Sequence, residues 1–225
     1  MLHWIVPDGF KGETTMRKIV SSLIILMFLV CVGAGATRGS AAEHATVSAS
    51  PAKASSPALA PEIKRAMYAI KVFKGRLQGE LIKAMQAGGP VNAIEVCNTR
   101  AEDIAAEVSK KQNFTMKRVS LKNRNPHNAA DGWQRTVLTA FEQRKQNGEP
   151  VTGLTYADIV ETDTGKQFRF MKAIPAGSIC MKCHGTNIAP AVQSELDALY
   201  PGDKARGYKP GDIRGAFVVT RDLDR

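Results

Sequence analysis

The chain has 225 residues, of which 44% are hydrophobic and 23% are charged. These shares are typical of a globular protein with a single core, and they exclude wholesale disorder, a collagen-like chain and a multi-pass membrane protein. The formal net charge is +10, but acidic residues are interleaved with the basic ones. A solvated basic surface is the simplest interpretation, and attraction to an acidic partner or to anionic lipid is the alternative.

The first 42 residues have the features of a secretory signal. Met16-Arg17-Lys18 precedes an apolar run over residues 19–32, which is shorter than the roughly 20 residues that a membrane helix needs. Small residues follow, and we favour cleavage after Ala42. Residues 1–15 fit no part of a signal, so Met16 is the predicted start. We therefore expect a periplasmic protein that keeps no stable membrane span after cleavage and binds no nucleic acid.

Residues 43–60 and residues 61–225 differ in composition. The first stretch is rich in Ala, Ser and Pro with almost no large apolar side chains, which predicts a flexible tether. The second stretch is the predicted domain. Its first part carries apolar residues every three or four positions, which predicts a helix that ends at Gly88-Gly89 and another that begins at Pro90. Cys97 lies on the apolar stripe of this second helix.

The sequence pattern in the rest of the domain predicts one long helix, one short helix and four strands. The helices are expected over residues 130–146 and 190–200, and the strands over 114–121, 154–161, 166–174 and 213–220. Because helices come first and most strands come later, the sequence indicates an α+β fold with an antiparallel sheet.

The strongest chemical signal is Cys180-Met181-Lys182-Cys183-His184, the attachment pattern of c-type haem. Two thiols at this spacing can each bond one vinyl group of a single porphyrin, and the adjacent imidazole then lies over the iron. A redox dithiol and half of a zinc site are the alternatives, but no βαβ pattern and no second ligand pair accompany the motif. We therefore predict one covalent haem c, with thioethers at Cys180 and Cys183 and with His184 as an axial ligand.

The other axial position of the iron decides the function, because an open position binds small ligands and a filled one favours electron transfer. Cys97 is one candidate, since removal of Cys31 with the signal leaves three cysteines, which disulfide pairing alone cannot explain. His127 and a methionine such as Met116 or Met171 are the others. Taken singly, these side chains also fit a buried small hydrophobe, an exposed loop residue and core residues, respectively.

Four separated motifs occur in order along residues 61–225. They are Ala93-Ile94-Glu95-Val96-Cys97-Asn98, then Ser120-Leu121-Lys122-Asn123-Arg124-Asn125-Pro126, then residues 180–185, and finally Tyr200-Pro201 with Gly207-Tyr208 and Gly211-Asp212-Ile213-Arg214-Gly215. With these motifs the chain resembles a family of exported single-haem c-type proteins with a PAS-like fold. The resemblance implies a five-stranded antiparallel sheet flanked by N-terminal helices, and an axial pair in which Cys97 opposes His184. Relatives in that family often occur as input modules of membrane sensor proteins.

The chemistry of the residues fits this implied axial pair. A thiolate donates charge to iron, stabilises the ferric state and lowers the reduction potential, so Cys97 is the distal ligand that we expect. Lys122 and Arg124 can neutralise the haem propionates through charge-assisted hydrogen bonds. The alternative is that these two residues are solvated charges of a loop.

Function follows from what the iron does. We expect a non-enzymatic module in which a change of oxidation state, or exchange of Cys97 for a small molecule, is read by a partner. The alternative is a mono-haem cytochrome that passes electrons between periplasmic partners docked on the basic surface. A haem peroxidase would need a distal acid/base histidine, for which His127 is the candidate. The partner is an unidentified redox or signalling protein, acidic if it docks on that surface, and the oligomeric state is left open.

Overall fold

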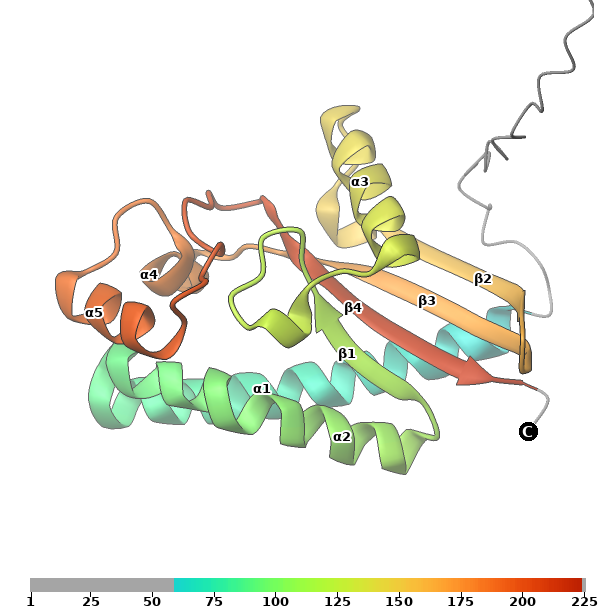
Figure 1. The fold of residues 1–225 in the computed structure, drawn as a ribbon, viewed down its shortest axis with the longest axis horizontal. Coiled ribbons are helices and arrows are strands. Elements are labelled where there is room, and N and C mark those ends of the chain that lie inside the picture. The colour runs from blue at the N-terminus through green and yellow to red at the C-terminus, as the bar shows by residue number, and fades with distance from the viewer. Residues whose placement is uncertain (1–58, 224–225) are drawn as a thin grey trace, which may run out of the picture. The chain divides into compact units, whose positions relative to one another are not determined.

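The computed structural model describes residues 59–223, so the predicted signal and nearly all of the predicted tether lie outside the described residues. Long N-terminal helices are followed by an antiparallel sheet, as the α+β prediction requires. In Figure 1, helices α1 and α2 lie along one face of the sheet and α3 lies on the other side. Within residues 59–223, no helix is both long and apolar enough to span a membrane.

Helix α1 (Ala60–Glu95) is kinked where the sequence predicts a break between two helices. Gly89 has φ 73° and ψ −162°, a conformation that only glycine adopts without strain, and Pro90 has no N–H to donate. The Asn92 side-chain amide donates to the carbonyl oxygen of Ala84 at 3.1 Å. This hydrogen bond satisfies a carbonyl group that the kink releases, so the chain continues as one bent helix.

A single π-helical turn, Val96–Arg100, joins α1 to α2 (Ala101–Gln112) and contains Cys97. In this turn the Thr99 hydroxyl donates to the Glu95 carbonyl oxygen at 2.9 Å. The π turn inserts a residue into the helical repeat, and such turns are rare and often lie at functional sites. The apolar periodicity of the sequence predicts a continuous helix here and gives no sign of the extra residue.

The sheet has four strands in the order β1-β4-β3-β2, and each neighbouring pair is antiparallel. The strands are β1 (Thr115–Val119), β2 (Thr155–Thr162), β3 (Gly165–Pro175) and β4 (Ile213–Asp222). They coincide with the four strands predicted from alternation. The fifth strand implied by the family resemblance is absent from the part of the chain that the structure describes. Between β3 and β4 the chain instead forms α4 (Met181–His184), α5 (Pro190–Leu199) and a turn-rich loop.

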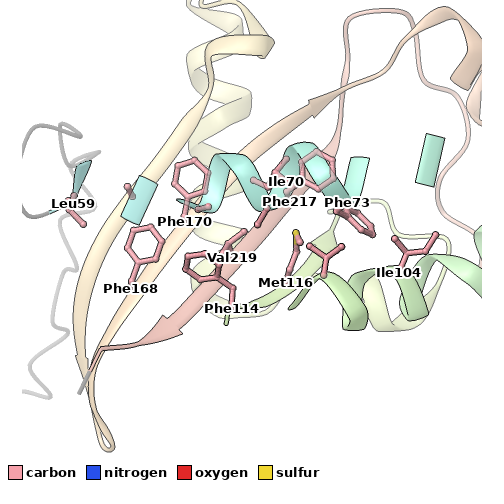
Figure 2. Packing of buried hydrophobic residues seen from close by; sticks show 14 residues of the cluster. Leu59, Ile70, Phe73, Ile104, Phe114, Met116, Phe168, Phe170, Phe217 and Val219 are labelled. Carbon is pink, nitrogen blue, oxygen red and sulfur yellow. The ribbon is translucent and has the colours of Figure 1, made fainter. Parts of the chain in front are cut away.

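Each face of the sheet carries its own hydrophobic cluster. The larger cluster packs α1 and α2 against the sheet and contains Phe73, Phe168 and Phe170 (Figure 2). The other packs Leu138 and Phe141 of α3 (Gly132–Gln146) against the opposite face. Because side chains alternate along a strand, successive residues of β4 contribute to different clusters. The sheet is therefore buried on both faces.

A third, smaller cluster positions the functional site. Ile94, near the end of α1, packs with Val192 and Leu196 of α5 and with Tyr200, and Cys183 lies partly buried against them. Figure 1 shows α5 beside the end of α1 that follows the kink. This packing brings the turn that precedes Cys97 to the segment that holds the predicted haem attachment residues.

Candidate functional site

The CxxCH motif, residues 180–184, begins at the end of a 3-10 turn (Ser178–Cys180) and continues as the single turn α4. Both thiols are free and half-buried, and helical backbone angles at Cys180 extend the turn so that the two cysteines, three positions apart, lie on one side of it. Gly185 follows directly, and a Cβ there would lie 2.7 Å from the Met181 carbonyl oxygen. Only glycine therefore fits after the motif.

The imidazole of His184 is held in one tautomer. Its Nδ1 lies 2.8 Å from the carbonyl oxygen of Ala205, and a carbonyl oxygen can only accept, so Nδ1 carries the proton and Nε2 carries the lone pair. Burial, aided by the charges of Arg214 and Arg124, lowers the pKa of His184 to about 2. The ring is therefore neutral at physiological pH, which is the form that ligates a metal ion.

The loop over residues 200–212 fixes the motif from the other side. The backbone N–H groups of Gly207 and Tyr208 donate to the carbonyl oxygens of Gly185 (3.0 Å) and His184 (2.9 Å). The Tyr208 ring stands nearly perpendicular to the imidazole, with 6.3 Å between ring centres and 87° between planes. The sequence indicates only that this loop is rich in turns; its hold on the motif is visible only in the structure.

Cys97 lies in the same region as the motif. Burial raises the pKa of the Cys183 thiol, with Cys97 among the charges that contribute. Burial and then the Cys97 thiol raise the pKa of Tyr200 to about 12. The π turn therefore places the Cys97 thiol within electrostatic reach of Cys183 and Tyr200. Across residues 59–223, no three His, Cys, Asp or Glu side chains converge as ligands of one metal ion.

Of the two predicted propionate contacts, Arg124 lies against the motif, whereas Lys122 contacts the loop over residues 200–212. The Arg124 guanidinium is buried, pairs with the Asp203 carboxylate at 3.1 Å and donates to the Cys183 carbonyl oxygen at 2.5 Å. Lys122 is exposed, and its Nζ donates to the Arg206 carbonyl oxygen at 2.7 Å. Arg124 thus already has a carboxylate partner and ties the motif to the loop.

The other candidate axial ligands lie in different surroundings. Met116 and Met171 are 5% and 0% exposed and belong to the clusters on the two faces of the sheet. His127 is on an exposed 3-10 turn (Pro126–Asn128), and its Nδ1 lies 3.1 Å from Glu102 Oε1. These placements correspond to the core and loop interpretations of the sequence.

The sequence analysis gives no role to two arginines of the site, although Arg214 belongs to the last of the four motifs. Arg214 Nη2 lies 3.3 Å from His184 Nε2, and its buried Nε has no hydrogen-bond partner among the described residues. Arg118 lies on β1 with its guanidinium 5.8 Å from the centre of the Phe73 ring. Burial lowers the pKa of both, and neither forms an ion pair with a carboxylate within residues 59–223. For Arg118 the sequence did hold a signal: it lies two positions after the buried Met116 on a strand, so both side chains are on the same face.

Comparison with known proteins finds a matching family model and a solved structure with a similar fold. The Tll0287-like family model matches residues 35–221. A solved structure described as that of the cyanobacterial haem protein Tll0287 matches with a TM-score of 0.54 and 19% identity, over 73% of this chain and 96% of that one. No curated protein matches the chain. The likeness to the solved structure shows a shared fold, and because the family model covers most of the sequence, the chain belongs to the Tll0287-like family.

Proposed function

We propose that this chain is a haem protein of the c type, with one porphyrin bonded through Cys180 and Cys183 and with His184 and Cys97 as axial ligands. The observation that carries this proposal is the neutral imidazole of His184, whose Nε2 is left with a lone pair by the hydrogen bond from Nδ1 to Ala205. That imidazole directly follows two free thiols three positions apart, which is the sequence spacing of the c-type haem attachment motif. Membership of a family whose solved relative is described as a haem protein supports the same cofactor.

The residues around the motif also fit a haem. Arg214 has a buried Nε without a hydrogen-bond partner beside His184, and a buried cation of this kind favours an anionic group next to it. A haem carries two propionates, so its charge complements the arginines of the site. When bound, the haem supplies an iron that cycles between the ferric and ferrous states.

The protein's own residues position that iron. Ala205 orients the imidazole of His184 through its carbonyl oxygen, and Arg124 holds the motif against the loop through Cys183 and Asp203. Cys97 supplies a thiol from the π turn, where deprotonation would give the thiolate that binds iron. Met116 and Met171 belong to the core, and His127 is paired with Glu102, so Cys97 is the distal ligand that this arrangement supports best.

We place this haem protein in the periplasm as a redox- or ligand-responsive module without enzymatic activity. The position of Cys97 in a π turn supports a responsive role over plain electron transfer. A π turn departs from regular α-helical hydrogen bonding, and release of Cys97 from iron would allow the turn to rearrange. A partner can read such a change, because the same turn connects α1 to α2 along the sheet.

The test is a set of spectra of the matured, full-length chain. Expression with cytochrome-maturation machinery should give a coloured protein whose pigment resists extraction by acid acetone. Cys97→Ser should change the ferric spectrum, whereas Thr99→Ser in the same turn, which keeps a hydroxyl, should leave it unchanged. Carbon monoxide or nitric oxide should displace the distal ligand of the ferrous protein.

Three results would count against the proposal at different levels. A colourless or extractable product would contradict covalent haem. An unchanged ferric spectrum in Cys97→Ser would contradict Cys97 as the ligand. Indifference to carbon monoxide and nitric oxide, with reversible one-electron cycling, would leave a haem protein whose role is electron transfer.

A further inference from the structure

We propose that Arg118 and Arg214 form the site that binds the propionate carboxylates of the haem. This inference rests on the proposed function and assigns residues to one part of it. The two arginines come from β1 and β4, which are neighbouring strands, and both are partly buried and form no ion pair with a carboxylate within residues 59–223.

Arg214 is held next to the iron-binding nitrogen of His184. Its Nη2 lies 3.3 Å from His184 Nε2, and its guanidinium lies 5.3 Å from the centre of the Tyr208 ring. A guanidinium carries five N–H donors, and the Nε of Arg214 is buried without a hydrogen-bond partner in the described region. When His184 Nε2 binds iron it can no longer accept from Arg214, so the guanidinium exchanges that acceptor for a carboxylate.

Arg118 extends this positive region towards Cys97. Its guanidinium lies over the Phe73 ring of the larger hydrophobic cluster, at 5.8 Å from the ring centre. The groups that act electrostatically on it are the Cys97 thiol, the Tyr200 hydroxyl and the Glu102 carboxylate. Glu102 is exposed and already accepts from Asn125 and His127, and it has the smallest electrostatic effect of the three on Arg118.

The positive charge of the site exceeds its buried negative charge. Arg118 and Arg124 both act electrostatically on Arg214, so three guanidiniums share one region. The buried carboxylate there is Asp203, which Arg124 shares with Arg206. Arg118 and Arg214 therefore each call for one further anion besides Asp203. A haem brings two carboxylates on one edge of the ring. Arginine suits this role because its planar fork can bind a carboxylate through two parallel hydrogen bonds.

The first test measures the propionates directly in the matured, full-length chain. Arg118→Met and Arg214→Met should each shift the propionate-bending band in the resonance Raman spectrum. Lys117→Met is the matched control: it removes the same charge from the neighbouring position of β1, whose side chain points to the other face, and should leave the band unchanged. A band that moves in Lys122→Met but stays fixed in both arginine variants would overturn the assignment and favour Lys122.

The second test asks whether the chain recognises the carboxylates themselves. Full-length chain produced without maturation machinery is titrated with haem and with haem dimethyl ester, in which both carboxylates are blocked. The wild type should bind haem at least about tenfold more tightly than the ester, because a hydrogen bond from a guanidinium to a charged carboxylate is stronger than one to a neutral ester. The double variant Arg118→Met with Arg214→Met should lose this preference, and Arg118→Lys with Arg214→Lys, which keeps the charges and the fold, should retain part of it.

The outcomes separate this inference from the proposed function. Equal preference for haem over the ester in the wild type and in both double variants would overturn the arginine assignment while leaving haem binding intact. If the wild type bound neither porphyrin and matured to a colourless product, the proposed function itself would fail, and the assignment with it.

Discussion

The carbonyl oxygen of Ala205 accepts the Nδ1 proton of His184 at 2.8 Å, and this one hydrogen bond decides which nitrogen of the imidazole is free to bind iron. Ala205 is itself held by Asp203, whose Oδ1 accepts from the Ala205 N–H at 2.8 Å. The other Asp203 oxygen pairs with Arg206 at 2.8 Å and Arg124 at 3.1 Å. A buried aspartate thus organises the loop that orients the ligand.

Replacing this aspartate should cost stability. The Asp203 side chain is 2% exposed, and removing one partner of a buried ion pair typically costs about 3–5 kcal/mol because the other charge stays unpaired. We expect Asp203→Asn to lower the free energy of unfolding, measured in urea, by about 3 kcal/mol. Asp197→Asn is the matched control. Asp197 is 61% exposed and pairs with Arg206 at the surface, so its loss should cost less than about 1 kcal/mol. Equal losses would contradict this role of Asp203.

The same residue predicts a pH dependence. Burial alone would raise the pKa of Asp203, but hydrogen bonds from Arg206, Arg124 and the Ala205 N–H outweigh it, so the pKa is lowered in the folded state. A lowered folded pKa stabilises the protein above the unfolded value of about 3.9, and this contribution disappears as the pH falls through the folded value. The difference in unfolding free energy between wild type and Asp203→Asn should therefore be full at pH 7 and should shrink below about pH 4. A difference that does not change with pH would show that the charge of Asp203 contributes nothing.

Tyr208 should act through its ring and not through its hydroxyl. The ring packs edge-on against His184, whereas the hydroxyl makes long contacts, at 3.4 Å to the Lys122 carbonyl oxygen and 3.5 Å to Ser120 Oγ, and hydrogen-bonds with Arg214. Tyr208→Phe should cost less than about 1 kcal/mol and leave the haem spectrum unchanged. Tyr208→Leu should cost about 2 kcal/mol and perturb the spectrum. If Tyr208→Phe alone produced the full effect, the hydroxyl would be the important group.

The fold could be predicted largely from local patterns. The four strands follow from alternation, the capped start of α3 at Asp131 and Gln134 follows from residue types that favour helix ends, and the kink follows from Gly88-Gly89-Pro90. The π turn at Cys97 could not be predicted, because an inserted residue leaves the apolar spacing on either side intact. The fifth strand came from family resemblance and not from the residues, and the segment that follows β3 forms helices and a loop instead.

The candidate site could be predicted only in part for a related reason. The CxxCH motif is local in sequence, so its residues were identifiable. Asp203, Ala205 and Tyr208 reach His184 across about 20 positions of turn-rich chain, and no short-range pattern encodes that return. Arg124 was identifiable as basic and near a loop, but its partner Asp203 lies far along the sequence. Arg118 and Arg214 are distinguished by burial, which depends on the tertiary fold.

Two glycines of the kinked helix α1 should respond to alanine substitution with opposite changes in stability. Gly89 has a positive φ with ψ near −160°, so Gly89→Ala should destabilise the protein by about 1–3 kcal/mol. Gly79 lies in a regular part of the same helix with nothing within 4 Å of an added Cβ, so Gly79→Ala should stabilise it by about 0.5–1 kcal/mol. Thermal unfolding of both variants checks the pair. A stabilising Gly89→Ala would mean that the helix straightens at no cost.

Gly215 is the position where the sheet and the site are most tightly linked. Its φ is 153°, and a Cβ there would lie 2.2 Å from the Val119 carbonyl oxygen, so β4 approaches β1 at a distance that only glycine allows. The neighbouring Arg214 carbonyl oxygen accepts from Ser120 Oγ at 3.0 Å, so a methyl group that separates the strands also displaces Arg214. Gly215→Ala should therefore cost roughly 3 kcal/mol or more through backbone strain and overpacking together.

The same substitution should also reduce the haem content of the matured protein, measured as absorbance per chain, because Arg214 moves with the strand. Gly153→Ala is the control, since an added Cβ there meets nothing within 4 Å, and it should leave stability and haem content unchanged. If Gly215→Ala lost stability but kept full haem content, the approach of β4 to β1 would serve the sheet alone. The position of Arg214 would then not depend on the fit between these two strands.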